Sequence, residues 1–401
     1  MTFLFWSCVA VMVYAYVGYP FIMWLLSRFS PEPPPPPTDN WPSVSLIIAA
    51  FNEENVIEEK LNNALSLGYP RGKREIIVVS DGSTDRTDEI VAGFRTQGVH
   101  LIRLERQQGK TAAQNIAVAQ AKGDILVFSD ANAFYEPNAL QWLIWHFSRG
   151  DVGCVEGRRV DFTPQRSATA RHELAYRDME SHIKAWESRV LSCTGATGPI
   201  YAVRRALYIP LDPAMISDFM EPLLIMYYHH KRHIFEPCAI SREAVLPDLK
   251  DEFARKVRII TRCLTSLRIR PGVLNPFRMG GFAIQIISHR LLRWMIPVFA
   301  LTGFTANLFL LHHPFYRMTF LLQVSFILVA AIGAMLDQLN IGPALLRLPH
   351  YFFAANLAAF EAIINCLQNK NFVTWKTQRP ESNPPTHDVY RPSAAATHEC
   401  T

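Results

Sequence analysis

The opening segment constrains the fold more than any other feature, because it carries no charged side chain over a length that matches a bilayer. From Phe3 to Leu26 there is no Asp, Glu, Lys or Arg. A helix of about 24 residues covers roughly the 30 Å of a hydrocarbon core. A cleaved signal peptide is the alternative, but the sequence has no basic region before Phe3 and no small-residue cleavage site before Arg28. We therefore expect residues 1–28 to form a membrane anchor.

The residues after this segment predict its orientation and a spacer. Arg28 is the first charged side chain, so the positive-inside tendency places the chain from this point onward in the cytoplasm. The run Pro33–Pro37 must be extended polyproline, which makes residues 29–41 a stiff linker that lifts the next domain off the bilayer. An SH3-type ligand is the alternative interpretation of this run.

A second apolar zone begins near Phe282 and contains two charge-free stretches. Met295–Leu311 and Thr319–Leu336 have no formal charge, and the short loop between them indicates a helical hairpin. The preceding segment Ile284–Arg293 mixes apolar and basic positions at helical spacing. It predicts an amphipathic helix at the cytoplasmic face of the membrane.

The next apolar stretch, Ala344–Cys366, is interrupted by Arg347, His350 and Glu361. It could span, re-enter or lie flat at the interface. Basic residues within 370–379 belong in the cytoplasm by the positive-inside tendency, which favours two late spans and a third, interfacial helix. We therefore expect two or three C-terminal membrane helices. The tail is rich in Pro, Ser, Thr and Ala and is expected to be disordered.

Residues between these membrane segments have the pattern of a soluble α/β domain. Apolar runs at 44–50, 75–80, 100–104 and 124–129 predict strands, and helical periodicity separates them at 55–67, 85–95 and 110–121. Strands that alternate with helices of about ten residues indicate βαβ units and a mostly parallel sheet flanked by helices.

Three of the predicted strands end in polar or acidic residues, at Asn52-Glu53, Asp81 and Asp130. Any one of them alone could cap a helix or close a turn. Because parallel strands place their carboxyl ends at one edge of a sheet, all three together predict a polar pocket there.

The chemistry of that pocket follows from its residue types. The sequence has no Gly-x-Gly-x-x-Gly after the first strand and no P-loop, which removes the usual support for dinucleotide or P-loop binding. Asp130 and Asn132, two positions apart, can reach one hard cation that also takes diphosphate oxygens. Lys110, preceded by Gly109, adds positive charge for a phosphate. The net charge of +5 comes without a dense Lys/Arg block, so nucleic acid is not expected as a partner.

Six motifs follow one another along the chain. They are AFNEE at 50–54, VSDGSTD at 79–85, GKTAAQN at 109–115, SDAN at 129–132, GATGPIYAVRR at 195–205 and ISDF at 216–219. Their order and spacing resemble the family 2 glycosyltransferases, which are inverting enzymes of GT-A fold. The later motifs resemble the membrane-embedded branch that includes cellulose, hyaluronan and poly-N-acetylglucosamine synthases. The resemblance covers residues 42 to about 295.

The resemblance implies a role for each matching residue on the donor side. Glu53 and Asp81 would contact the nucleoside, expected to be uridine, and Lys110 would approach the diphosphate. Asp130 would hold Mg²⁺ or Mn²⁺ through the diphosphate. Asn132 stands where the family usually has a second Asp, which removes one negative charge from the expected metal site.

Asp218 matches the catalytic base of the family, although Ser217 replaces the usual acidic residue before it. A carboxylate on the face opposite the leaving diphosphate can deprotonate the acceptor hydroxyl, and a single displacement from that side inverts the anomeric configuration. Glu221, one helical turn later, is the competing candidate.

A departure from the family pattern bears on processivity. Processive synthases carry Gln-x-x-Arg-Trp about forty residues after the base, and the corresponding stretch here is Arg255–Ile259. Arg258 keeps the cation expected to touch the diphosphate. Ile259 cannot stack on a sugar as Trp does, so processive polymer synthesis is in doubt.

The sequence therefore predicts a multi-pass transferase of the cell inner (plasma) membrane with its catalytic domain in the cytoplasm. Its expected partners are a nucleotide-sugar donor, a glycan or lipid-linked acceptor and membrane lipid, with an export subunit left open. A degenerate transferase-like scaffold subunit is the alternative. The expected domains are the anchor at 1–28, the linker at 29–41, the catalytic domain at 42–275, an interface helix at 276–294, membrane helices at 295–367 and a cytoplasmic or disordered tail at 368–401.

Overall fold

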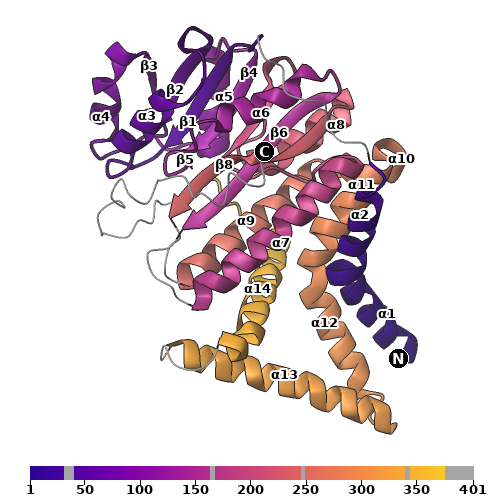
Figure 1. The fold of residues 1–401 in the computed structure, drawn as a ribbon. Helices are drawn as coiled ribbons and strands as arrows, with labels where there is room; N and C mark the ends of the chain where they lie inside the picture. The colour runs from indigo at the N-terminus through magenta and orange to yellow at the C-terminus, as the bar shows by residue number, and fades with distance from the viewer. Residues whose placement is uncertain (31–39, 163–167, 245–248, 339–343, 375–401) are drawn as a thin grey trace.

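The computed structural model describes residues 1–30, 40–162, 168–244, 249–338 and 344–374 of the 401-residue chain. The strands and the helices around them form one body, and the apolar helices from the two ends of the chain extend away from one side of it (Figure 1).

The first strands form the parallel half of an eight-stranded sheet. β1 (Val44–Ala50) pairs with β2 (Arg74–Ser80) and with β4 (Ile125–Asp130), and β2 pairs with β3 (Val99–Arg103), all in parallel. These four strands begin and end within one residue of the predicted positions. The α/β fold that the alternating pattern predicted is confirmed.

The second half of the sheet is mixed. β7 (Tyr201–Arg204) runs antiparallel between β4 and β6 (Val152–Phe162), and β8 (Arg232–Ala244) pairs in parallel with β6. The short β5 (Phe134–Tyr135) pairs antiparallel with β8 at the sheet edge. Because β7 opposes both of its neighbours, β6 and β8 point the same way as β4, and their carboxyl ends reach the same edge of the sheet.

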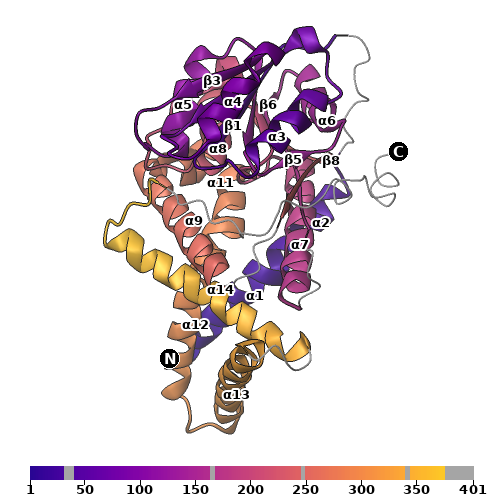
Figure 2. The ribbon, with the colours of Figure 1, turned by 90° about the vertical axis from the view of Figure 1, so that its left-hand side faces the viewer.

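Helices cover both faces of this sheet (Figure 2). Apolar side chains of α3 (Ile57–Ser66), α4 (Thr87–Gly93) and α6 (Ala139–Trp145) share one buried cluster with the strands. Those of α5 (Lys110–Gln120) and α8 (Ser217–His229) share a second cluster. Successive side chains of a strand point to opposite faces, so Leu46 and Ile47 of β1 enter different clusters. Burial on both faces explains the uninterrupted apolar run of β1.

Two long helices lie between the sheet and the apolar helices. α7 (Ala168–Val190) contacts both β8 and α2 (Tyr19–Ser27), whereas α9 (Leu249–Ile269) contacts α14 (Ala344–Leu367). In Figure 2 both α7 and α9 lie below the sheet, on the side from which the apolar helices extend.

Three helices of the described residues are long and apolar enough to cross a membrane, namely Thr2–Ser27, Gly281–Leu308 and Pro314–Leu336. They fit the predicted layout of one N-terminal and two C-terminal helices. Within the first two, α1 (Thr2–Val13) packs along α12 (Leu292–Leu308). The segment 284–293, expected as a separate interface helix, continues into α12 without a break.

Shortening a fully buried side chain of β1 tests the packing of the sheet. We expect Leu46→Ala to lower the free energy of unfolding by about 3 kcal/mol, because it removes buried methyl groups and leaves a cavity. Denaturant unfolding of the full chain in detergent measures this change. An unaltered transition would contradict the packing described.

Candidate active site

The loops that follow β1 and β2 hold each other through side-chain to backbone hydrogen bonds. Asn52, whose φ is +53°, accepts a hydrogen bond at Oδ1 from the Thr84 amide at 2.8 Å. The amide of the buried Glu53 donates to Thr87 Oγ1, also at 2.8 Å. Asp85 in turn accepts from the Thr87 amide at 3.0 Å. The polar residues of both motifs therefore shape this edge of the sheet.

Asp81 fixes the loop in front of α5. Its side chain is fully buried, and its two carboxylate oxygens accept hydrogen bonds from the backbone amides of Gln108 at 2.8 Å and Gly109 at 2.9 Å. Burial raises the pKa of Asp81 above its ordinary value, and the two hydrogen bonds only partly offset this. Gly109 has φ +97°, a conformation that favours glycine. By holding Gly109, Asp81 thus fixes the point at which α5 begins with Lys110, the residue after Gly109.

Lys110 connects the carboxyl end of β4 with the start of α8. Its Nζ forms a short ion pair with Asp130 Oδ1. A Cβ added to Gly198 would lie 2.7 Å from Asp218 Oδ2 and 3.2 Å from Lys110 Nζ. The ammonium and the Asp218 carboxylate therefore lie beside the same glycine, where a larger residue would displace one of them.

The charges of these three groups depend on one another. Burial acts to lower the pKa of Lys110, but Asp130 and Asp218 outweigh it and raise the pKa. Burial acts to raise the pKa of Asp130, yet the Lys110 charge and hydrogen bond hold it below its usual range. The pKa of Asp218 is raised by burial, which Lys110 only partly opposes. Asp218 is thus the more basic of the two carboxylates.

Glu221, the competing base, is engaged elsewhere. It lies one turn after Asp218 on α8, is fully buried, and accepts a hydrogen bond at Oε1 from the Ile209 amide at 3.0 Å. Burial raises the pKa of Glu221 to about 8. Its hydrogen bond ties the start of α8 to the segment that precedes it.

α9 contributes two arginines to the region. Arg258 is partly buried. Burial lowers its pKa, whereas the negative charge of Asp130 acts to raise it. Arg262, one turn further, donates from Nη2 to Thr111 Oγ1 at 3.2 Å and to the Met215 carbonyl at 2.5 Å. It therefore joins α5 to the segment before α8. Arg262 was not predicted from the sequence, although it lies four residues after Arg258 and therefore on the same helix face.

Lys60 is a second residue that the sequence analysis missed. Its side chain on α3 is fully buried, donates from Nζ to Ser129 Oγ at 2.8 Å and to the Ala133 carbonyl, and lies 4.4 Å from the centre of the Tyr135 ring. It braces both sides of the Asp130 segment. No signal in the sequence separates it from an exposed lysine of an amphipathic helix.

The segment from Thr194 to Gly198 packs on the start of α8. Gly195 has φ +128°, and a Cβ there would lie 2.8 Å from the Phe219 ring. The amide of Ala196 donates to the Asp218 carbonyl at 2.8 Å. The glycine-rich motif thus lets the backbone approach the residue expected to be the base.

A separate buried group, Glu156, Cys193 and His233, brings three atoms able to bind a metal within 4.8 Å of one another. Lys184 Nζ lies 2.6 Å from Glu156 Oε2, so an ammonium already compensates the carboxylate there. A hard cation that takes phosphate oxygens is better served by the oxygens of Asp130 and Asn132.

Among the residues predicted from the motifs, the structure gathers Lys110, Asp130 and Asp218 around one position, and Asp81 is joined to it through Gly109. The pKa of Arg258 responds to the charge of Asp130. Glu53 lies at the neighbouring strand end, where its amide joins the two loops. Asn132 follows Asp130 in the turn after β4 and is partly buried.

Comparison with known proteins links this geometry to a family. Residues 45–209 match the family described as Glycosyl transferase family 2. The chain is 34% identical over 145 residues to beta-monoglucosyldiacylglycerol synthase of Synechocystis, covering 34% of this chain and 30% of the relative. It is 32% identical over 116 residues to poly-beta-1,6-N-acetyl-D-glucosamine synthase of Staphylococcus epidermidis, covering 28% of each. The chain spans half or less of the length of the curated relatives it matches.

A solved structure resembles the whole architecture. The mannosyltransferase PcManGT from Pyrobaculum calidifontis, in complex with GDP-Man and Mn²⁺, superposes with a TM-score of 0.67 at 22% identity. The match covers 92% of this chain and all of that one. It supports the GT-A fold that the motifs predicted.

Lys60 provides a test based on pH. Burial lowers its pKa to about 7, so above this pH the unfolded chain binds a proton that the folded chain does not. Stability should therefore rise from pH 7 towards the ordinary lysine pKa, by at most about 1.4 kcal/mol per pH unit. In Lys60→Met we expect this rise in the unfolding midpoint to disappear, while Lys122→Met, at an exposed lysine, should keep it. Equal pH profiles for both variants would contradict the assignment.

Proposed function

We propose that the chain, whose residues 45–209 match the family 2 glycosyltransferases, is a membrane-bound, inverting enzyme of that family. It moves a sugar from a nucleotide diphosphate, expected to be a UDP-sugar, to a lipid-linked glycan or a growing polysaccharide. The observation that carries this proposal is the position of Lys110, paired with Asp130 and beside Asp218. Sugar transfer needs a cationic group for the leaving diphosphate and a basic group for the acceptor.

Residues at the end of β4 suit the leaving group. Asp130 is partly exposed and, with Asn132 two positions later, offers oxygen ligands of the kind that Mg²⁺ and Mn²⁺ prefer. When bound, such a cation supplies Lewis-acid neutralisation of the diphosphate. Lys110 and Arg258 add positive charge on the same side, so departure of the nucleotide leaves no uncompensated negative charge.

Asp218 is the proposed base. Its raised pKa favours uptake of a proton from the acceptor hydroxyl, while the neighbouring Lys110 charge acts in the opposite direction and favours the carboxylate form that the reaction requires. Attack of that hydroxyl on the face opposite the diphosphate forms the new glycosidic bond as the old bond breaks. The anomeric configuration inverts, so an α-linked donor gives a β-glycoside.

Asp81 and Glu53 are proposed to serve the nucleoside end of the donor. Asp81 accepts from the amides of Gln108 and Gly109, so it also holds the loop against which the diphosphate would lie. Glu53 is buried between the two loops at the neighbouring strand ends.

The membrane helices favour an acceptor that is lipid-linked. Ile259 replaces the aromatic residue that would hold a polymer, and it is partly exposed on α9. With Arg28 as the first charge after the anchor, the catalytic domain is placed on the cytoplasmic side of the inner membrane. Export of a polymer would require a partner subunit. The scaffold alternative is not favoured, because the charged groups that the chemistry needs are present, with Lys110 paired with Asp130 and Asp218 beside the same glycine as Lys110.

The donor and the acceptor can be identified together. Membranes that contain the protein are incubated with radiolabelled UDP- and GDP-sugars, and lipid-soluble product is separated from polymer. We expect label from one UDP-sugar in the lipid fraction. Label confined to polymer would overturn the assignment of a lipid-linked acceptor. Label from GDP-sugars alone would overturn the assignment of uridine as the donor nucleoside.

Replacing the base tests the mechanism. Asp218→Asn removes the proton acceptor, and we expect kcat for transfer to fall by about a factor of 10² to 10⁴ while UDP affinity stays within about twofold. Asp212→Asn, at an exposed aspartate in the segment before α8, is the matched control. Glu221→Gln should retain transfer. Loss in Glu221→Gln with activity kept in Asp218→Asn would assign the base to Glu221 instead.

Removing the cation tests the donor side. Calorimetry with UDP and Mn²⁺ should show binding that EDTA weakens by at least about tenfold. Without the cation, the negative diphosphate would face the negative Asp130 carboxylate directly. Asp130→Asn should weaken the Mn²⁺ dependence. UDP affinity that EDTA leaves unchanged would exclude Asp130 as a metal ligand.

A further inference from the structure

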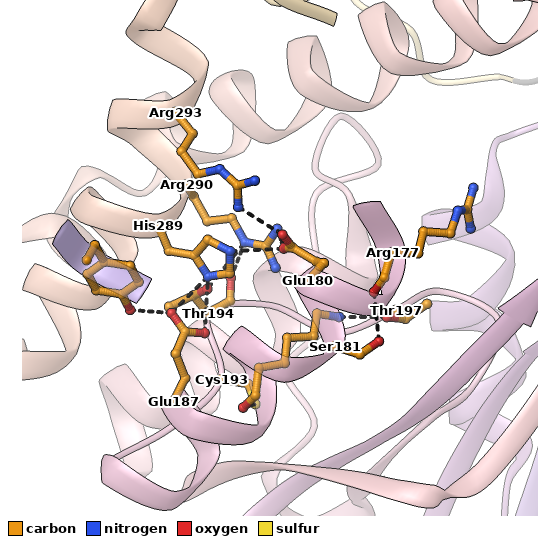
Figure 3. Close-up of polar contacts among 12 residues, drawn as sticks. Arg177, Glu180, Ser181, Glu187, Cys193, Thr194, Thr197, His289, Arg290 and Arg293 are labelled. Carbon is orange, nitrogen blue, oxygen red and sulfur yellow. Dashed lines mark hydrogen bonds and ion pairs between the residues drawn. The ribbon is translucent and has the colours of Figure 1, made fainter. Parts of the chain in front are cut away.

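Three segments far apart in the sequence meet in a buried polar group beside the segment 194–198. We call Tyr19, Glu187, Thr194 and His289 the junction cluster. Tyr19 lies on α2 near the end of the first apolar helix, Glu187 on α7, Thr194 in the segment after α7, and His289 within the apolar helix Gly281–Leu308. All four side chains are buried. Figure 3 shows Glu187, Thr194 and His289 converging.

Glu187 is the centre of the cluster. The Tyr19 hydroxyl donates a short hydrogen bond to Glu187 Oε1, and Thr194 Oγ1 donates to Glu187 Oε2 at 3.2 Å. His289 Nδ1 lies 2.8 Å from Glu187 Oε1. On the other side of the ring, His289 Nε2 lies 3.0 Å from an oxygen of Glu180, which also pairs with two arginines of the same apolar helix. A carboxylate oxygen thus lies within 3.0 Å of each ring nitrogen of His289.

Both apolar helices change their winding where they meet this cluster. Tyr14–Gly18, just before Tyr19, and Ile287–Leu291, which includes His289, are π-helical. The Tyr14 hydroxyl and the Ser288 hydroxyl lie 2.9 Å apart, so the two segments also contact each other. A π-helical turn inserts a residue and re-aims the side chains around it, which is common at functional sites.

The cluster is connected to the proposed base through two routes. Thr194 lies two residues before Ala196, whose amide donates a hydrogen bond to the Asp218 carbonyl. The Trp294 ring, one turn after Arg290 on the apolar helix, lies edge-on to Phe219 with 5.8 Å between ring centres. Arg290 Nε also donates to the Thr194 carbonyl at 3.3 Å. Residues of the apolar helix Gly281–Leu308 thus contact both Thr194, in the segment that holds the Asp218 carbonyl, and Phe219, the residue after Asp218.

A purely structural junction would not need these charges. Burying a carboxylate and an imidazole costs desolvation, and apolar residues of similar volume commonly pack as well or better. Directional hydrogen bonds instead fix one arrangement of the three segments relative to one another. The geometry therefore suits a cluster that positions the three segments relative to one another.

We propose that the junction cluster positions the acceptor side of the active site. Through Thr194 it holds the segment 194–198 and, with it, Asp218, so that transfer to the acceptor depends on how the two apolar helices pack against α7. Tyr19, Glu187, Thr194 and His289 are positioning residues, and none of them touches the donor. This inference rests on the proposed role of Asp218.

The test uses the full-length protein in membranes and, for binding, in detergent. Tyr19→Phe and Thr194→Val each remove one hydroxyl from Glu187 with little change in volume. We expect the kcat for transfer of radiolabelled sugar to fall by about tenfold in each, as for loss of one hydrogen bond to a charged group. The affinities for UDP and for GDP, each with Mn²⁺, should stay within about twofold, since the donor side is untouched. Tyr228→Phe, at an exposed tyrosine of α8, is the control and should match the wild type.

Two outcomes would overturn the inference alone. One is wild-type transfer in both Tyr19→Phe and Thr194→Val. The other is a parallel fall of transfer, nucleotide affinity and the unfolding midpoint, which would mean that the cluster only supports the fold. Failure of the wild type to bind either nucleotide would overturn the proposed function and, with it, this inference.

Discussion

The ion pair of Lys110 with Asp130, formed beside Asp218, is the interaction on which the site depends. Asp130 ends a central strand and Asp218 begins a helix almost ninety positions later in the sequence. Without a cation beside them, two partly buried carboxylates would repel each other. The Lys110 charge and hydrogen bond hold the pKa of Asp130 below its usual range, whereas burial outweighs Lys110 at Asp218 and raises its pKa. The direct pairing of Lys110 with only one of the carboxylates therefore goes with different properties of two chemically identical groups.

Several features of the fold serve to hold that charge in place. Asp81 binds the loop before Lys110, Lys60 braces the segment around Asp130, and Arg262 joins α5 to the approach of α8. Asp81 and Lys60 are buried and Arg262 is partly buried, and each of the three bonds backbone atoms of the segment that it holds. Such groups are costly to leave unsatisfied, so they restrict the loops at the sheet edge to one arrangement.

The apolar helices are attached to this arrangement through directional bonds as well as through packing. α7 lies between the sheet and the first apolar helix, and it carries Glu180 and Glu187 towards His289. A shift of either helix would break hydrogen bonds that end next to Asp218. A transferase with a lipid-linked acceptor would benefit from a site built against the helices that meet the lipid.

The sequence by itself determined the order of strands and helices in residues 44–130, the three apolar helices and the motif residues at the strand ends, because these depend on local periodicity and chain direction. Only the tertiary structure decided that β7 runs antiparallel, that Lys60 is buried, that Arg262 joins the site and that Tyr19 meets Glu187. Such facts depend on which surfaces pack together across more than a hundred residues, and no local pattern encodes the partner of a side chain. The pairing of Lys110 with Asp130 belongs to both: strand direction predicts the shared edge, and packing alone sets the contact.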